Sequence, residues 1–319
     1  MRVAVTGGAG YIGAHVVDLL VARGDEVVVL DDLSTGVRER VGTADFVGVD
    51  LAATFDPESL ATHLAGADAV IHFTAKKRVD ESVARPAWYF HQNITSLANV
   101  LAAAAAADAT KFIFSSSAAV YGAVDGRPVP ETTPAHPVNP YGETKLAGEW
   151  LVADAAASMG LQASSLRYFN VAGAARPQLG DTAALNIIPI VMQHARAHQA
   201  PVIFGDDYPT PDGTCVRDYI HVTDLARAHL AALDGLAGRP EPHRTYNVGT
   251  GTGHSVREVV DAVRRHAPDM PAAQIAPRRR GDPASVVADP TRIQRELGWS
   301  ADHSLADIVD SAWQAIAAG

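Results

Sequence analysis

The segment TGGAGYIG, residues 6–13, decides the predicted fold. It follows a short β-branched run, residues 2–6, and opens an apolar pattern with helical spacing. Gly7, Gly10 and Gly13 leave the backbone of this turn without side chains, so a phosphate group can approach the amides at the start of the helix. The spacing is G-x-x-G-x-x-G rather than G-x-G-x-x-G, so this interpretation depends on its context.

The next predicted strand supplies that context. Residues 27–30 are apolar and lead into Asp31, about 18 residues beyond Gly13, where a carboxylate that binds a ribose is expected. Its negative charge would repel a 2′-phosphate, which favours NAD over NADP, although Arg38 and Arg40 leave NADP open as an alternative. A solvated turn at Asp31 and Asp32 is the competing interpretation.

Short apolar runs alternate with longer helical patterns through the first half of the chain. This alternation is typical of βαβ units and predicts an α/β fold with a doubly wound parallel sheet, the Rossmann arrangement. The expected strands cover residues 2–6, 26–30, 46–49, 69–73, 111–115 and 164–168, and the expected helices cover residues 11–23, 57–64, 88–107 and 141–159.

The regular alternation fades after about Asn170, where prolines divide the chain into short elements. We therefore expect a nucleotide-binding Rossmann domain over residues 1–170. A smaller C-terminal α/β domain that binds the substrate is expected over residues 171–319, with some of its segments returning to the first domain.

Composition excludes several classes of partner. Hydrophobic residues form 47% of the 319 residues and the formal net charge is -10, which opposes binding to nucleic acid and requires local positive groups for any anionic ligand. Cys215 is the single cysteine and cannot form an internal disulfide. No apolar stretch approaches the roughly 20 residues that span a bilayer. We therefore expect a cytoplasmic protein with neither nucleic-acid nor membrane partners.

Tyr141 and Lys145 form a Y-x-x-x-K pair at the start of a predicted helix, where both side chains lie on one face. A phenol titrates near 10, so a tyrosine acts as a base near neutral pH only when positive charge lowers its pKa. Lys145 together with a nicotinamide cation would supply that charge. Such pairs also occur on exposed helices, but here the run Ser115, Ser116 and Ser117 ends a predicted strand at the edge where doubly wound sheets bind ligands.

Taken together, these motifs resemble the extended short-chain dehydrogenases, and specifically the UDP-glucose 4-epimerases. The resemblance spans nearly the whole chain, and the segments LRYFN and DGTCVRDY point to the epimerases rather than to the superfamily at large. The motifs are TGGAGYIGAH (6–15), IHFTAKKRVDES (71–82), KFIFSSSAAVYG (111–122), NPYGETK (139–145), LRYFNVAGA (166–174), IFGDDYPTPDGTCVRDYIHV (203–222) and RRRGDPASVVAD (278–289).

The resemblance implies Tyr141 as the acid and base, Lys145 as its electrostatic partner and ribose ligand, and Ser117 as the hydroxyl that assists proton transfer. It implies NAD as the cofactor, and no metal site is expected. The implied cofactor contacts are Gly7, Gly10, Tyr11, Ile12, Gly13, Asp31, Asp32, Asp50, Leu51, Phe73, Ala75, Lys77, Asn93, Ser115, Tyr141, Lys145 and Tyr168. The implied substrate contacts are Ser117, Tyr141, Asn170, Asn186, Ile187, Val202, Phe204, Arg217, Arg279 and Asp282.

The implied reaction is epimerisation of a UDP-hexose at C4, in UDP-glucose and UDP-galactose, through a transient 4-keto sugar. Arg217 and Arg279 would bind the diphosphate despite the acidic chain. Val286 stands where some family members have a bulky tyrosine, so UDP-N-acetylhexosamines are a possible substrate class, as are UDP-pentoses. The resemblance also suggests a homodimer formed through helices near residues 88–107 and 141–159.

Other functions fit the residues less well. A nucleotide-sugar 4,6-dehydratase needs an acidic pair after the fifth strand, where this chain has Ala118 and Ala119. A protein that only senses NAD has no need for a complete catalytic set. His194 and His198 lie four residues apart on a predicted helix but lack the glutamate of a metalloprotease motif. Cys215 is expected to be a packed thiol.

Overall fold

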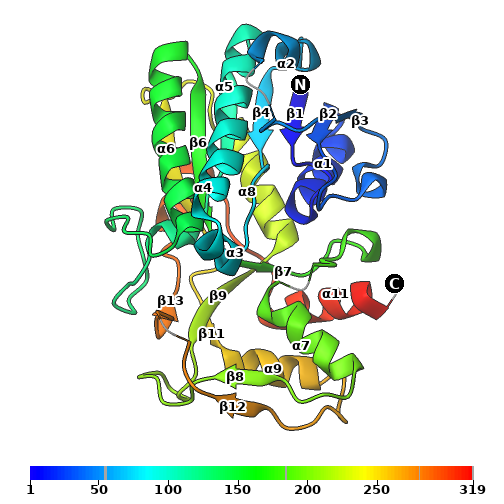
Figure 1. Cartoon of the computed structure of the whole chain (residues 1–319), viewed down its shortest axis with the longest axis vertical. Coiled ribbons are helices and arrows are strands. Elements are labelled where there is room, and N and C mark those ends of the chain that lie inside the picture. The colour runs from blue at the N-terminus through cyan, green and yellow to red at the C-terminus, as the bar shows by residue number, and fades with distance from the viewer. Residues whose placement is uncertain (54–55, 184, 280, 318–319) are drawn as a thin grey trace.

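The computed structural model describes residues 1–53, 56–183, 185–279 and 281–317 (Figure 1). Seven parallel strands form one sheet in the order β10-β6-β5-β4-β1-β2-β3. This sheet confirms the predicted doubly wound parallel fold, and the limits of the six predicted strands differ from the observed ones by at most two residues. The strands are β1 (Arg2–Thr6), β2 (Glu26–Asp31), β3 (Asp45–Gly48), β4 (Ala69–His72), β5 (Lys111–Ser115), β6 (Gln162–Tyr168) and β10 (His243–Val248).

Helices cover both faces of this sheet, because side chains of alternate residues in each strand point to opposite faces. In β1, Val3 and Val5 pack into the cluster that holds α1 (Tyr11–Arg23) and α8 (Val222–Asp234). Ala4 packs into the opposite cluster, beneath α2 (Pro57–Leu64), α5 (Ser96–Ala106) and α6 (Pro140–Met159). Both faces are therefore buried, which explains why the strands are nearly continuous apolar runs.

The helix predicted over residues 88–107 begins earlier and is not regular. It consists of α4 (Pro86–Phe90), a π-helical turn His91–Thr95 and α5, and it follows the short α3 (Val79–Ala84). The π-helical turn contains the buried side chain of Asn93, whose amide bonds both the N–H and the carbonyl of Lys76 at 2.7 and 3.0 Å. Such turns often occur at functional sites.

The second half of the chain builds a lower lobe with its own core (Figure 1). Its strands are β7 (Asn170–Ala172), β9 (Val216–His221), β11 (Gly253–Ser255) and β13 (Ser285–Val286) in one sheet, and β8 (Val202–Phe204) with β12 (Gln274–Ala276) in another. Its helices are α7 (Ile187–Arg196), α9 (Val256–Arg264) and α11 (Leu305–Ala317). Short 3-10 helices occur at Arg38–Val41, Ala118–Val120 and Pro177–Leu179.

The chain crosses between the two lobes more than once. Strand β10 and helix α8 belong to the second half of the sequence, yet β10 pairs with β6 and α8 packs on α1 in the first lobe. The helix α10 (Thr291–Leu297) lies beside β10. A domain boundary at residue 170 therefore stays a prediction.

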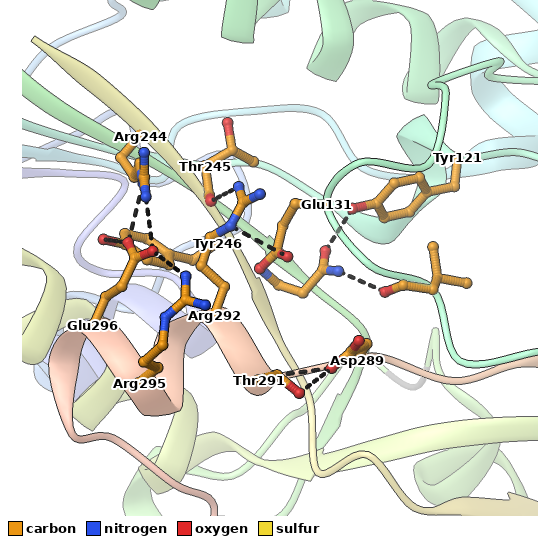
Figure 2. Close-up of polar contacts among 12 residues, drawn as sticks. Tyr121, Glu131, Arg244, Thr245, Tyr246, Asp289, Thr291, Arg292, Arg295 and Glu296 are labelled. Carbon is orange, nitrogen blue, oxygen red and sulfur yellow. Dashed lines mark hydrogen bonds and ion pairs between the residues drawn. The ribbon is translucent and has the colours of Figure 1, made fainter. Parts of the chain in front are cut away.

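An ionic cluster ties β10 to α10 and to the loop before α6 (Figure 2). Arg244 of β10 pairs with Glu296 of α10 at 2.7 Å, and the Tyr246 hydroxyl donates to the same carboxylate at 3.1 Å. Arg292 approaches Glu131 at 3.6 Å. Because β10 is the edge strand of the sheet, this cluster covers an edge that would otherwise expose unpaired backbone groups.

Glu296→Gln is expected to lower the free energy of unfolding by about 1 kcal/mol at pH 7. The hydrogen bond from Arg244 lowers the pKa of Glu296 from 4.5 to about 2. A carboxyl whose folded-state pKa is lowered stabilises above its unfolded pKa and loses that contribution as pH falls through the folded pKa. The difference between wild type and variant in urea denaturation should therefore narrow between pH 4.5 and about 2. A difference in stability that stays constant over this pH range contradicts a stabilising ion pair between Glu296 and Arg244.

Among the described residues, no helix is long and apolar enough to cross a membrane. Cys215 is buried, as predicted for a packed thiol. The helix predicted to carry both His194 and His198 is wrong in its extent, because α7 ends at Arg196 and His198 has a left-handed φ of 50°.

Candidate active site

The glycine turn between β1 and α1 depends on close backbone packing. Gly7 has a φ of 69°, and a Cβ there would lie 2.8 Å from the Thr74 amide nitrogen. A Cβ on Gly13 would lie 2.4 Å from the Gly7 carbonyl oxygen. Gly10 caps α1 without a side-chain hydrogen bond, so no side chain caps the first amides of this helix. The turn thus presents a cradle of backbone N–H groups at the positive end of a helix.

Asp31 closes β2 beside this turn. It is buried, and its carboxylate accepts the Ala9 N–H at 3.0 Å and the Leu33 N–H at 2.8 Å. Burial raises the pKa of this carboxyl. Asp32 is exposed and accepts the Ser34 N–H at 2.9 Å. Asp31 is therefore a fixed carboxylate at the carboxyl edge of the sheet, which is the position expected of a ribose ligand.

Arg38 and Arg40, the two arginines considered as partners for the 2′-phosphate of NADP, contact other groups of the protein. The Arg38 guanidinium lies over the Phe46 ring at 4.6 Å. Arg40 is buried and donates to the Gly180 carbonyl. Neither contact directs a guanidinium toward Asp31, which weakens the NADP alternative.

The remaining predicted cofactor residues differ in their surroundings. Asp50 accepts the Ala52 N–H at 2.9 Å, and Leu51 is buried. Phe73 and Ala75 follow β4 and are half-buried, whereas Lys77 is exposed. The Tyr11 hydroxyl donates to the Gly173 carbonyl at 2.6 Å, so only its backbone faces the turn, and Ile12 follows it at the start of α1.

Sequence reasoning missed Lys76. Its ammonium donates to the Ser34 hydroxyl at 2.9 Å, and its positive charge lowers the pKa of Asp31 against the larger effect of burial. The signal was present as two adjacent lysines after β4, but sequence spacing does not show which of the two turns toward β2. With the open amides, the glycine cradle and a fixed carboxylate, the residues at this edge fit a dinucleotide.

Tyr141 and Lys145 lie on the first turns of α6. The helix begins where the Asn139 carboxamide oxygen accepts the Gly142 N–H at 2.9 Å, and Pro140 occupies the first position of the helix. Both predicted side chains are buried. The Lys145 ammonium donates to the Ser115 carbonyl oxygen at 2.7 Å, at the end of β5.

The serines that follow β5 complete the group. The Ser117 hydroxyl accepts the Ala119 N–H at 3.2 Å and hydrogen-bonds to the Tyr141 phenol. The Ser115 hydroxyl donates to the Tyr168 hydroxyl at 3.1 Å. The structure therefore brings together Ser115, Ser117, Tyr141, Lys145 and Tyr168.

Burial dominates the electrostatics of this group. It raises the pKa of Tyr141 well above its usual value, and the neighbouring Tyr168 adds to the rise while the Ser117 hydrogen bond opposes it. Burial also lowers the pKa of Lys145 to about 7, against the opposing charge of Glu149. The protein without its cofactor thus keeps the phenol protonated, and the lysine alone does not produce the predicted lowering of the phenol's pKa.

The predicted substrate residues form local groups in and near the second lobe. Arg217 of β9 pairs with Asp282 at 3.0 Å. The Arg279 guanidinium lies over the Phe204 ring of β8 at 3.9 Å, near Val202 on the same strand, and Arg280 lies outside the described residues. The Asn186 amide donates to the Val171 carbonyl at 3.2 Å, Ile187 begins α7, and Asn170 is exposed at the start of β7.

Asp218 has an organising role that sequence reasoning missed. It is fully buried in β9 and accepts the N–H groups of Thr250, Gly251 and Ala288 at 2.9 to 3.2 Å. Its place in the segment DGTCVRDY was visible, but its partners lie far along the chain. Within the part of the chain that the structure describes, no group of three or more His, Cys, Asp or Glu residues could hold a metal ion.

Comparison with known proteins agrees with this geometry. The model of the NAD dependent epimerase/dehydratase family matches residues 3–249. A UDP-glucose 4-epimerase from Corynebacterium glutamicum is 42% identical over 98% of this chain and 95% of that protein. The structure of the Bifidobacterium longum UDP-glucose 4-epimerase in complex with NAD+ and UDP superposes with a TM-score of 0.90 at 36% identity, covering 100% of this chain and 98% of the other.

The structure of a UDP-Glc/GlcNAc 4-epimerase from Campylobacter jejuni is also similar, with a TM-score of 0.87 at 36% identity over 100% of this chain and 99% of the other. The family match covers most of the chain, and the relatives align over nearly their full length. The chain therefore belongs to the NAD dependent epimerase/dehydratase family, as the resemblance of its motifs to the UDP-glucose 4-epimerases predicts.

Proposed function

We propose that this protein is an NAD-dependent 4-epimerase that interconverts UDP-glucose and UDP-galactose. The observation that carries the proposal is the meeting of Tyr141, Ser117 and Lys145 at the end of β5, on the carboxyl edge of the sheet. The UDP-sugar relatives make a nucleotide sugar the natural substrate of such a site.

In this proposal, Tyr141 takes the proton from the C4 hydroxyl and later returns a proton to the C4 oxygen. Bound NAD supplies reversible acceptance of a hydride. Ser117 passes the proton between the sugar oxygen and the phenol to which it hydrogen-bonds. Burial keeps the phenol protonated in the protein alone, so the positive charge of the nicotinamide and of Lys145 is needed to favour the phenolate.

The sugar must present both faces at C4, so the rest of the substrate has to carry the binding energy. Arg217 and Arg279 lie in the second lobe and supply positive charge for the diphosphate. The hexose is then free to turn as a 4-keto sugar while the nucleotide stays bound.

The test is turnover of UDP-galactose by the purified protein without added NAD, with the products separated by chromatography. UDP-N-acetylgalactosamine and UDP-arabinose are assayed in parallel. Inversion at C4 supports the proposal together with a retained cofactor. A lack of conversion, even with NAD supplied, overturns the proposed activity, and loss of water to a 4-keto-6-deoxy sugar replaces it with a dehydratase.

The space beside the sugar is expected to admit an N-acetyl group. Val286 lies on β13, pairs in register with Arg217 and packs on the cluster that contains Tyr121 and Phe169. Val286→Tyr would fill space next to this cluster, so kcat/KM for UDP-N-acetylgalactosamine should fall about tenfold while that for UDP-galactose changes less. The measurement is the ratio of the two kcat/KM values. An unchanged ratio contradicts the size argument.

The enzyme is proposed to be a homodimer joined through the helices near residues 88–107 and 141–159. Phe90 of α4 is 38% exposed, and Trp150 of α6 is 63% exposed. α4 packs on α6, so these two apolar side chains lie on neighbouring helices, and large exposed apolar side chains favour an interface there. The cytoplasmic location and the homodimer both stay predictions.

Trp150→Glu is expected to convert the dimer to a monomer, because a carboxylate would be buried without a partner at the interface. The measurement is molar mass by light scattering during size-exclusion chromatography. The control is Glu143→Ala, which changes another exposed residue of the same helix without placing a charge in an apolar contact. A wild-type protein that is already monomeric contradicts the proposal.

A further inference from the structure

We propose that Glu149, paired with Arg167, is a positioning residue that fixes the serine segment 115–117 against α6 and places a negative charge one helical turn from Lys145. The inference rests on the proposed function. It assigns a role to a buried ion pair that has no part in the catalytic roles proposed above. Glu149 lies on α6, one helical turn beyond Lys145. Both side chains are buried and belong to the first half of that helix.

The ion pair has two-point geometry. The Arg167 Nε donates to Glu149 Oε1 at 2.9 Å, and Nη2 donates to Oε2 at 2.6 Å. Arg167 lies on β6 and Glu149 on α6, so the pair joins the sheet to the helix that bears the proposed base. Such a planar, bidentate contact fixes orientation as well as distance.

A third contact points from this pair to the site. The Ser116 hydroxyl is buried and donates to Glu149 Oε1 at 2.5 Å. Ser116 stands between Ser115, whose carbonyl accepts the Lys145 ammonium, and Ser117, whose hydroxyl meets Tyr141. A shift of Ser116 would therefore displace the partners of both proposed catalytic side chains.

Stability alone does not account for this arrangement. A buried ion pair contributes little net stability compared with apolar side chains of similar volume, because both charges lose their hydration. This pair is retained in the core of the molecule, at the base of the proposed site. Its energetic cost is explained if the position of Ser116 and the charge of Glu149 both serve the site.

The charge of Glu149 acts on Lys145 against burial. Burial lowers the pKa of Lys145 to about 7, and the negative charge of Glu149 raises it. The titratable groups that face the two side chains are Tyr141 on α6, His72 on β4, Arg167 on β6 and His243 on β10. The carboxylate of Glu149 is the charge that opposes the effect of burial on the pKa of Lys145.

The first experiment compares pH profiles of kcat for wild type and Glu149→Gln. The glutamine keeps the shape of the side chain and an oxygen that accepts from Ser116, but it has no charge. The pKa of Lys145 should fall further, so the limb of the profile on the alkaline side should move to lower pH, because the negative charge that opposes the effect of burial is gone.

Glu131→Gln is the matched control. Glu131 is also a buried glutamate paired with an arginine, at 3.6 Å from Arg292, and it accepts the Asn247 N–H at 2.9 Å (Figure 2). It lies in the loop before α6, and its partners Asn247 and Arg292 belong to β10 and α10. The substitution also removes one carboxylate charge from an ion pair, so it controls for the loss of a charge as such, and the pH profile should stay where it is in wild type.

The second experiment uses Ser116→Ala, which leaves both charges of the pair in place and does not depend on tolerance of a missing charge. Loss of the hydrogen bond should let the serine segment shift, and a displacement of the order of 1 Å costs up to about a hundredfold in rate. The expected result is a kcat at least about tenfold lower with KM within about twofold of wild type, because the diphosphate is held in the other lobe.

The outcomes separate the two proposals. If wild type turns over no UDP-sugar, the proposed function fails first. If wild type is active, the positioning role is overturned by Ser116→Ala with wild-type kcat and KM, or by a Glu149→Gln profile that shifts no more than that of Glu131→Gln. If Glu149→Gln does not fold, as judged by thermal unfolding, the Ser116→Ala result decides.

Discussion

Replacing Tyr141 by phenylalanine is expected to lower kcat by about a thousandfold, because Ser117 then has no acid or base with which to exchange the proton of the sugar C4 hydroxyl. The phenol is buried beside Ser117 and Tyr168. Removing only the hydroxyl leaves the apolar ring and its packing. The affinity for UDP should stay within about twofold of wild type, because the second lobe holds the diphosphate.

The measurement pairs steady-state turnover of UDP-galactose with calorimetric titration of UDP. Tyr246→Phe is the matched control, since Tyr246 is also a buried tyrosine but its hydroxyl donates to Glu296 on α10, beside the edge strand β10 (Figure 2). That control should keep wild-type turnover. A Tyr141→Phe protein that keeps more than about a tenth of kcat would contradict the proposed role of the phenol.

Gly13→Ala is expected to abolish binding of the dinucleotide and to lower the free energy of unfolding by about 3 kcal/mol. The added Cβ would lie 2.4 Å from the Gly7 carbonyl oxygen and 2.8 Å from the Gly8 Cα. Both are backbone atoms, so neither can rotate away, and the turn between β1 and α1 must open. The amides that would face the phosphates then lose their arrangement.

The measurement is thermal unfolding with and without added NAD, together with the NAD content of the purified protein. Gly48→Ala is the matched control, because a Cβ there meets only the Phe46 ring, at 3.6 Å. That variant should retain NAD. A Gly13→Ala protein that contains NAD and unfolds at the wild-type temperature would show that the turn is not the phosphate cradle.

The effects of Tyr141→Phe and Gly13→Ala differ in how far the sequence alone predicts them. The importance of the Tyr141 phenol was predicted from the Y-x-x-x-K spacing, since helical geometry places residues four apart on one face whatever surrounds the helix. The steric conflict at Gly13 was not, because the distance from Gly13 to Gly7 depends on how the turn folds back between β1 and α1. In both cases the residue was named correctly as a candidate, but only the geometry gives the size of the effect.

Helices and strands whose periodicity is strong were predicted nearly to their observed ends. The helix α1 covers the predicted residues 11–23, and β5 covers 111–115. The π-helical turn His91–Thr95 was not predicted, because a continuous apolar pattern gives the same signal with and without one widened turn. Asn93, which this turn carries to the Lys76 backbone, was named only through the family resemblance.

The sequence by itself determined the parallel sheet, the glycine turn at its centre and the position of the Tyr141 and Lys145 pair, because these follow from local patterns of apolar residues, glycines and helical spacing. Only the tertiary structure decided which lysine turns toward Asp31, that β10 and α8 return to the first lobe, and that Glu149, Arg167 and Ser116 meet behind the serine segment. Burial and charge pairing arise between residues far apart in the chain, and such contacts leave no periodic trace in the sequence.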